Sequence, residues 1–164
     1  MKLYLGIDNG YTGAIAALLP DGTVLHRPSA VQNLGRDKFL DIRRNSETLR
    51  EMIDAAAVSK LQVLVACELS TKNPLFRTNN YANGKNGEFW RVLLSMSDIP
   101  FVSVHPQTWQ AQVFHGLRGG DTKAKALLTV QQRFPNVSYG NYNAEQVRGT
   151  DAICIALWAR EQNK

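Results

Sequence analysis

Three acidic residues that lie far apart in the chain occupy positions where a carboxylate is costly without a nearby cation. Asp8 follows the apolar segment 3–7, Glu68 follows the apolar run 61–67, and Asp151 precedes the apolar run 152–159. A charged group at the edge of a buried strand needs a partner of opposite charge. Hard cations such as Mg²⁺ bind oxygen ligands, and two of them ~4 Å apart can activate water for phosphodiester cleavage. The three acids therefore indicate a metal site or phosphate chemistry.

Each acid also has a simpler interpretation. Asp8 can shape the turn that follows it, and Asp151 can stabilise the start of a helix. The metal hypothesis requires the three carboxylates to meet in space. If the strands ending at Asp8 and Glu68 lie side by side, both acids stand at one end of a sheet, and a helix packed on that sheet brings Asp151 to the same place.

The elements that must position these acids follow from hydrophobic periodicity. The pattern predicts three consecutive strands over 2–8, 12–19 and 22–27, with Asp21-Gly22 as a hairpin turn, and later strands over 61–67 and 100–104. It predicts helices that begin at Ser46, span 88–97, 107–114 and 122–134, and begin again at Thr150, with loops over 30–45, 70–83 and 135–149. This order predicts an α/β domain with a mixed five-stranded sheet, three antiparallel strands followed by parallel strands, flanked by helices.

Composition limits the class of protein. The chain has 164 residues and 44% hydrophobic content, which suits one domain spanning 1–164. The apolar runs are too short for a membrane span, and the N-terminus lacks a signal core. Cys67 and Cys154 each lie in an apolar run, as expected of buried thiols in a reduced cytoplasmic protein. The net charge of +5 favours a polyanionic partner.

Four motifs resemble the RuvC family of Holliday junction resolvases in order and spacing. They are Gly6-Ile7-Asp8-Asn9-Gly10, Cys67-Glu68, Gly119-Gly120-Asp121-Thr122-Lys123, and Asp151-Ala152-Ile153-Cys154-Ile155-Ala156. The resemblance spans nearly the whole chain and implies an RNase H-like fold. The short chain with its Asn-rich middle is similar to the phage-encoded members.

The resemblance implies a metal-dependent endonuclease for Holliday junctions or other branched DNA. Asp8, Glu68 and Asp151 match the metal-binding acids, with Asp8 bridging two Mg²⁺ or Mn²⁺ ions. Lys123 matches a lysine near the scissile phosphate, although it can equally be a solvated lysine in the first turn of a helix. The resemblance also implies a homodimer that works in the cytoplasm of a bacterium or of a phage-infected host, without membrane attachment.

Contacts with DNA are expected from basic and aromatic residues outside the acids. Basic side chains are expected to contact phosphates and two aromatic side chains to stack on bases: Lys72, Arg77, Lys85, Arg118 and Lys125, with Phe76 and Tyr81. Phe76 can instead anchor its loop on the core. Helix 88–97 is expected to contribute Phe89, Trp90 and Leu93 to the dimer interface, unless this face is ordinary core. Trp109 and Gln110 are expected to buttress the site.

The sequence departs from the family where bacterial relatives carry an Asp or His three residues before the last acid. This chain has Arg148 there, and a cation cannot bind a metal ion; Glu145 is the nearest acid. The departure leaves open a non-catalytic protein that binds branched DNA. An RNase H-like nuclease for RNA–DNA hybrids is another alternative. The glycine motif around Asp8 also suits sugar kinases and ATPases, but this chain is too short for their two halves.

Overall fold

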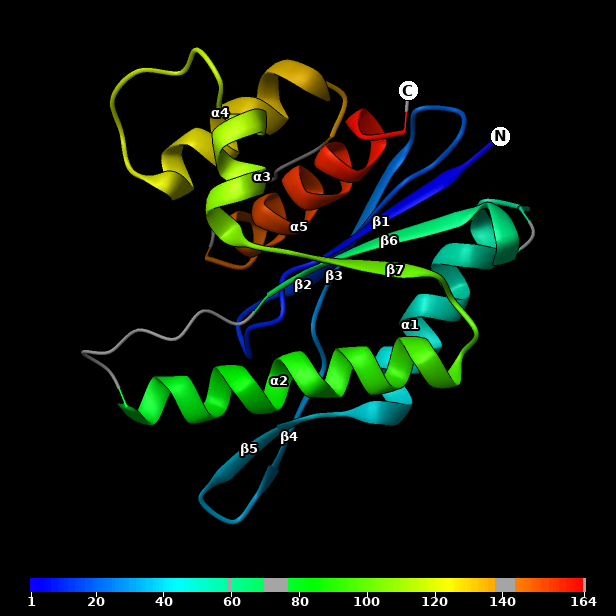
Figure 1. Ribbon diagram of the computed structural model, residues 1–164, viewed down its shortest axis with the longest axis vertical. Coiled ribbons are helices and arrows are strands. Elements are labelled where there is room, and N and C mark those ends of the chain that lie inside the picture. The colour runs from blue at the N-terminus through cyan, green and yellow to red at the C-terminus, as the bar shows by residue number, and fades with distance from the viewer. Residues whose placement is uncertain (59, 70–76, 138–143, 164) are drawn as a thin grey trace.

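The computed structural model describes residues 1–58, 60–69, 77–137 and 144–163. Its main sheet has five strands in the order β3-β2-β1-β6-β7 (Figure 1). Their bounds are β1 Leu3–Ile7, β2 Ala14–Leu18, β3 Val24–Pro28, β6 Val63–Glu68 and β7 Phe101–Val104. The first three strands pair antiparallel, and β6 and β7 extend the sheet in parallel with β1. The predicted α/β fold with a mixed five-stranded sheet is confirmed.

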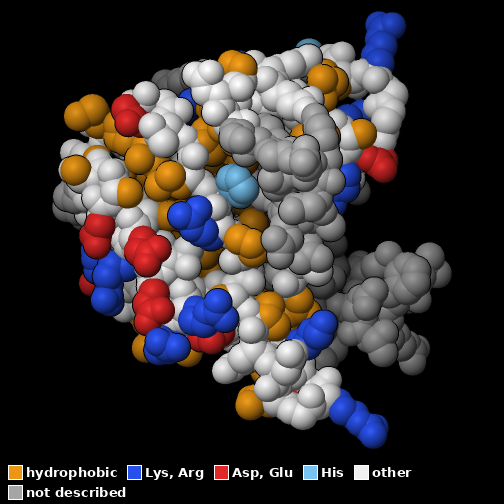
Figure 2. Space-filling view, turned by 180° about the vertical axis from the view of Figure 1, so that it is seen from behind, with side chains coloured by type: hydrophobic (Ala, Val, Ile, Leu, Met, Phe, Trp, Pro, Cys, Tyr) orange, Lys and Arg blue, Asp and Glu red, His pale blue; other side chains and the backbone are white. Residues whose placement is uncertain are grey.

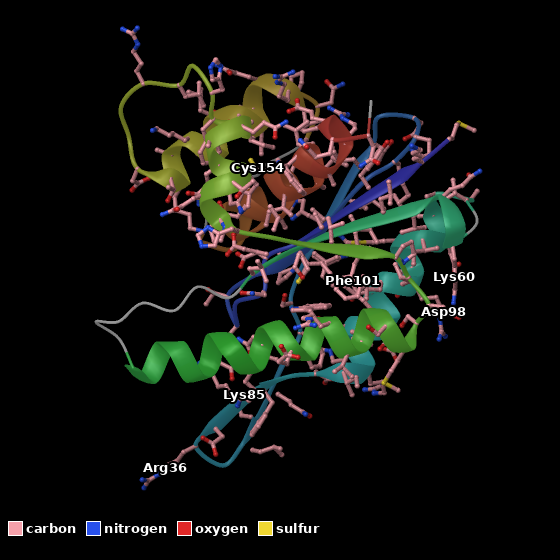
Figure 3. All side chains as sticks on the ribbon, in the orientation of Figure 1. Arg36, Lys60, Lys85, Asp98, Phe101 and Cys154 are labelled. Atoms are coloured by element: carbon pink, nitrogen blue, oxygen red, sulfur yellow. The ribbon has the colours of Figure 1, made fainter. Side chains whose placement is uncertain are left out.

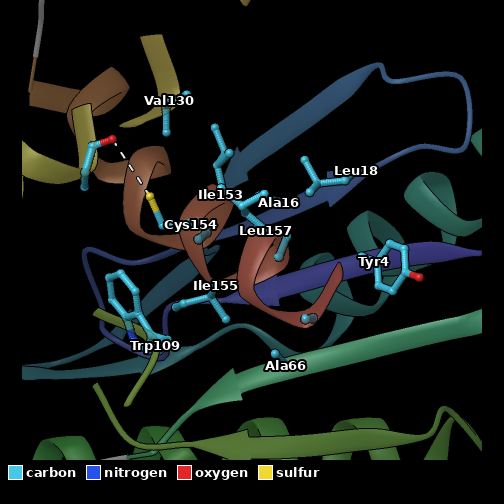
Figure 4. Close-up of a cluster of buried hydrophobic side chains, with 14 of the residues drawn as sticks. Tyr4, Ala16, Leu18, Ala66, Trp109, Val130, Ile153, Cys154, Ile155 and Leu157 are labelled. Carbon is cyan, nitrogen blue, oxygen red and sulfur yellow. Dashed lines mark hydrogen bonds between the residues drawn. The ribbon is translucent and has the colours of Figure 1, made fainter. Parts of the chain in front are cut away.

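Helices cover both faces of this sheet (Figure 1). One layer holds α1 (Ile42–Ala55) and α2 (Arg77–Met96), and the other holds α3 (Pro106–Val113), α4 (Thr122–Arg133) and α5 (Ala144–Glu161). Alternate residues of each strand supply the two hydrophobic cores. Leu3, Leu5 and Ile7 of β1 face the α1–α2 layer, whereas Tyr4 faces α5 (Figure 4). Within the described residues, each helix is too short or too polar to cross a lipid bilayer.

Helix α5 approaches strand β1 at Gly6 without an intervening side chain. A Cβ atom added at Gly6 would lie 2.1 Å from the carbonyl oxygen of Ala152 and 2.4 Å from the backbone nitrogen of Ala156. Only glycine allows two backbones to come this close. Because Ala152 is the residue after Asp151, this contact fixes the position of Asp151 relative to β1.

Several predicted boundaries are wrong. Residues 30–45 are not a plain loop, because β4 (Val31–Leu34) and β5 (Asp37–Leu40) form a separate two-stranded hairpin. Helix α1 begins at Ile42 rather than at Ser46, since the side chain of Asp41 accepts a hydrogen bond from the amide of Arg44. Helix α2 begins at Arg77, within the predicted loop 70–83.

The predicted start of the last helix is also wrong. Helix α5 begins at Ala144, within the predicted loop 135–149, so Thr150 is an interior residue rather than a cap and Asp151 lies well inside the helix. The sequence of residues 144–150, the first two helical turns of α5, lacks an apolar face. Hydrophobic periodicity therefore does not predict a helix there. Gly149 and Thr150 are nevertheless buried, with Gly149 against the ring of His26.

The residues expected at a dimer interface belong to the core instead. Trp90 and Leu93 of α2 are buried against the sheet, with Phe89 half-buried beside them. Val92 and Met96, on another face of the same helix, are exposed. The buried stripe of α2 is made by Trp90, Leu93 and Leu94.

The contact at Gly6 predicts a large loss of stability when any side chain is added there. We expect Gly6→Ala to lower the free energy of unfolding by about 3 kcal/mol, because the methyl group meets backbone atoms that cannot rotate away. Urea denaturation followed by circular dichroism measures the change.

Gly84→Ala is the matched control for this substitution. Gly84 lies within α2, and an added Cβ has no neighbour within 4 Å. Because alanine favours a helix over glycine, we expect this variant to be more stable by about 0.5–1 kcal/mol. Equal stability of the Gly6→Ala protein and the unsubstituted protein would contradict the close approach of α5 to β1.

Candidate active site

The first carboxylate, Asp8, is held at the end of β1 by a tight turn. Its backbone amide donates to the carbonyl of Ala14, which begins β2, and the amide of Gly10 donates to its Oδ1 atom at 3.2 Å. A Cβ at Gly13 would lie 2.2 Å from the backbone oxygen of Asp8, so the turn closes only around glycine. The Asp8 side chain is therefore fixed by its own loop.

The second carboxylate, Glu68, ends the neighbouring parallel strand. Ile7 of β1 pairs with Cys67 of β6, so Asp8 and Glu68 are the next residues on the two strands. Alternation along each strand directs both toward the α5 face, opposite Ile7 and Cys67. The predicted meeting of these two acids at one end of the sheet agrees with this register.

Two polar side chains fix the position of Glu68. The indole Nε1 of Trp109, from α3, donates to Glu68 Oε2 at 2.9 Å. The side-chain amide of Asn9 donates to the backbone oxygen of Glu68 at 2.6 Å. Trp109 and Asn9 are both buried. The buttressing role expected of Trp109 is thus a direct hydrogen bond to a site carboxylate, whereas the role of Asn9 was missed.

The third carboxylate, Asp151, projects from α5 beside the glycine contact at Gly6. The ammonium group of Lys123, in the first turn of α4, forms an ion pair with Asp151 Oδ2. Lys123 is half exposed, whereas the side chain of Asp151 is only 14% exposed. Among the residues described, no lysine or arginine forms an ion pair with Asp8 or Glu68.

The pKa values of the acids and of Lys123 are shifted by burial and by one another's charges. Burial raises the pKa of Glu68 to about 7, the charge of Asp8 adds to this, and the bond from Trp109 opposes it. Burial also raises the pKa of Asp8, and the charge of Asp151 acts in the same direction. Burial opposes protonation of Lys123, but the hydrogen bond and charge of Asp151 outweigh it and raise the pKa of Lys123. The site holds more negative charge than Lys123 offsets.

The carboxylates of Asp8, Glu68 and Asp151 are the type of ligand that a hard divalent cation prefers. Three carboxylates supply oxygen ligands, and their shared negative charge favours a bound cation. Within the described part of the chain, however, no three His, Cys, Asp and Glu side chains close around a common point. Asp151 turns to Lys123 and Glu68 turns to Trp109, so both carboxylates already have partners at this edge of the sheet.

The predicted DNA-binding residues fall into three groups. Lys72 and Phe76 lie outside the described residues, as do the side chains of Arg77 and Tyr81 at the start of α2. Arg118 is exposed in the loop between α3 and α4, and Lys125 is half-buried on α4, two residues after Lys123. Lys85 of α2 lies over the ring of Phe39 in β5 rather than beside the carboxylates.

The side chains of Arg148 and Glu145, which bear on a fourth metal ligand, also lie outside the described part. The two cysteines are free and buried, as predicted. Burial raises the pKa of Cys67 to about 12 and raises the pKa of Cys154 as well, so neither thiol is a nucleophile near neutral pH.

Comparison with known proteins finds likeness at the level of structure. No family model matches the sequence, and no curated protein matches it. The fold is similar to the structure of RuvC from Thermus thermophilus, with a TM-score of 0.58 and 13% sequence identity over 98% of this chain and 96% of that one. It is similar to T. thermophilus RuvC in complex with a Holliday junction substrate, with a TM-score of 0.57 and 12% identity over the same shares of both chains. The fold is RuvC-like, as predicted.

The raised pKa of Glu68 predicts a pH-dependent stability. Between pH 4.5 and about 7, native Glu68 holds a proton that the unfolded chain releases, so this group lowers the free energy of unfolding as pH rises. We expect Glu68→Gln, in the presence of EDTA, to be more stable than the unsubstituted protein by on the order of 2–3 kcal/mol at pH 8. At pH 4 the two proteins should have similar stability.

Urea denaturation at the two pH values measures this difference. Glu51→Gln, at an exposed position on α1, is the control, and its effect should not change with pH. A Glu68→Gln effect that is the same at pH 4 and pH 8 would contradict the burial of a carboxyl group with a raised pKa.

Proposed function

We propose that this protein is a metal-dependent endonuclease that cleaves Holliday junctions or other branched DNA. The observation that carries the proposal is the register that sets Asp8 and Glu68 at the ends of the paired strands β1 and β6 in a RuvC-like sheet. Asp151 of α5, ion-paired with Lys123, is near enough to raise the pKa of both acids. A neighbour of the same fold is described in complex with a Holliday junction substrate. The nuclease unit is proposed to span residues 1–164.

The roles of the side chains follow from their positions. Mg²⁺ or Mn²⁺ ions held by Asp8, Glu68 and Asp151 would supply an activated water and charge stabilisation for phosphodiester hydrolysis. Trp109 holds the Glu68 carboxylate in place. Lys123 brings an ammonium group to the rim of the site, where it can stabilise the charge that develops on the phosphate.

The basic residues supply the remaining contacts with the substrate. Arg118 and Lys125 lie on the same side of the sheet as Lys123, in the α3–α4 loop and on α4. Lys72, Arg77 and Lys85, together with Phe76 and Tyr81, remain predicted DNA contacts. A homodimer would match the two-fold symmetry of a four-way junction. Phage-type membership and action in the cytoplasm belong to the same proposal.

The metal role predicts that neutral substitutions abolish cleavage but not binding. We expect Asp8→Asn and Asp151→Asn to cut a synthetic four-way junction at least ~100-fold more slowly in Mg²⁺, because each removes an anionic ligand. The Kd for the same junction in EDTA should be unchanged or lower, since the substitutions remove negative charge facing DNA.

Asp54→Asn, an exposed aspartate of α1, is the matched control and should cleave normally. Full activity of either site variant would refute the metal role. Junction binding by the unsubstituted protein without cleavage in Mg²⁺ or Mn²⁺ would instead favour a non-catalytic binding protein. Faster cleavage of an RNA–DNA hybrid than of the junction would favour the hybrid nuclease.

The role of the Lys123 ammonium group in cleavage can be tested separately from that of the acids. We expect Lys123→Gln to lower the single-turnover cleavage rate by about 100-fold, because the positive charge beside the phosphate is lost. Lys60→Gln removes the same charge at the opposite end of β6, where Lys60 donates to the carbonyl of Ser97, and should cleave normally. Equal rates for the two variants would show that Lys123 is only a solvated lysine of α4.

A further inference from the structure

The β4–β5 hairpin is an arm that contributes little to either core. It projects below α2 at one end of the molecule (Figure 1), and all residues from 32 to 38 are exposed. Only Leu40, at its base, is buried. An isolated two-stranded hairpin is marginally stable in water, so the arm depends on contacts at its base.

These contacts converge on one backbone atom, the carbonyl oxygen of Lys38. The hydroxyl of Tyr11 donates to this oxygen at 2.7 Å, and the ammonium group of Lys85 donates to it at 3.3 Å. The same ammonium group lies 3.9 Å from the ring centre of Phe39 and 5.9 Å from that of Tyr11. The turn after β1, the hairpin and helix α2 thus meet in one cluster of contacts. This cluster, called the node below, consists of Tyr11, Lys38, Phe39 and Lys85.

The node ties the arm to the proposed active site. Tyr11 belongs to the tight turn between Asp8 and Gly13, three residues after the Asp8 carboxylate. The hairpin therefore has a fixed position relative to Asp8, although it is exposed along most of its length.

The chemistry of the arm suits a nucleic acid duplex. Its exposed side chains include the amides Gln32 and Asn33 and the cations Arg36 and Lys38, with Asp37 as its one acid. Arg36 points outward from the end of the hairpin (Figure 3). In the view from behind, the surface at this end of the molecule is largely uncharged and carries Lys and Arg side chains (Figure 2). A two-stranded ribbon fits the major groove of B-DNA, and cations along it contact phosphates.

We propose that the β4–β5 hairpin is a duplex-binding arm that contacts a DNA segment flanking the cleavage position, and that Tyr11 and Lys85 are its positioning residues. This inference rests on the proposed function, because it needs branched DNA as the ligand. It assigns Arg36 and Lys38 as phosphate contacts that the sequence pattern did not single out. It also gives Lys85 a role in holding the arm.

The test measures the affinity for a fluorescent four-way junction in EDTA over a range of salt concentrations. We expect the double variant Arg36→Gln/Lys38→Gln to bind more weakly and to lower the slope of log K against log salt by about 1 for each cation that no longer meets a phosphate. The control Lys60→Gln/Lys2→Gln removes two exposed charges that precede β6 and β1, at the ends of these strands away from Glu68 and Asp8, and should match the unsubstituted protein.

A second variant tests the tether without changing any charge. Tyr11→Phe keeps the ring but removes the hydroxyl that donates to Lys38, so we expect weaker junction binding with Arg36 and Lys38 still present. Because Tyr11 acts through the arm, combining the three substitutions should weaken binding by less than the product of the separate effects. A purely structural Tyr11 would instead give independent, multiplicative effects.

The outcomes separate this inference from the proposed function. If the unsubstituted protein binds and cleaves the junction but the Arg36→Gln/Lys38→Gln variant has the same affinity and salt slope, the arm is refuted and the nuclease stands. If the unsubstituted protein binds no branched DNA, both are refuted. Thermal unfolding of each variant identifies any loss of affinity that is due to misfolding, and Arg36→Lys should restore binding if the charge is what matters.

Discussion

The architecture of the site depends on the backbone contact between α5 and β1 at Gly6. Side chains usually separate a helix from a sheet and can adjust when the elements shift. Here the carbonyl of Ala152 and the amide of Ala156 occupy the space that a Cβ at Gly6 would need. The helix therefore has one permitted depth on the sheet. Since Asp151 precedes Ala152, this steric limit places the third carboxylate, and the parallel pairing of β1 with β6 places the other two.

Such a placement carries an electrostatic cost that the surrounding residues only partly offset. Burial and mutual repulsion raise the pKa values of Asp8 and Glu68, so the ionised site opposes folding near neutral pH. Lys123 offsets the charge of Asp151, and Trp109 donates to Glu68. Functional sites commonly retain repulsion of this kind, because groups poised to bind a cation or a phosphate cannot also be fully neutralised by the protein.

The sequence was sufficient to predict the sheet and the two strand-end acids, because period-two burial and chain order constrain a mixed sheet strongly. The β4–β5 hairpin was missed since residues 31–40 bury almost nothing, and burial is what periodicity detects. The early start of α5 was missed for the same reason. The hydrogen bond from Trp109 to Glu68 and the ion pair between Lys123 and Asp151 join residues 41 and 28 positions apart. Pairings of this kind depend on the packing of α3 and α4, which local sequence does not encode.

Asp8 lies between two contacts that connect its strand and turn to the two helical layers. On one side, its strand is held against α5 through Gly6; on the other, the turn that follows it is held against β5 and α2 through Tyr11. The turn between these anchors is too tight to absorb a displacement, because Gly13 contacts the backbone of Asp8. The position of the Asp8 carboxylate therefore depends on the packing of both layers.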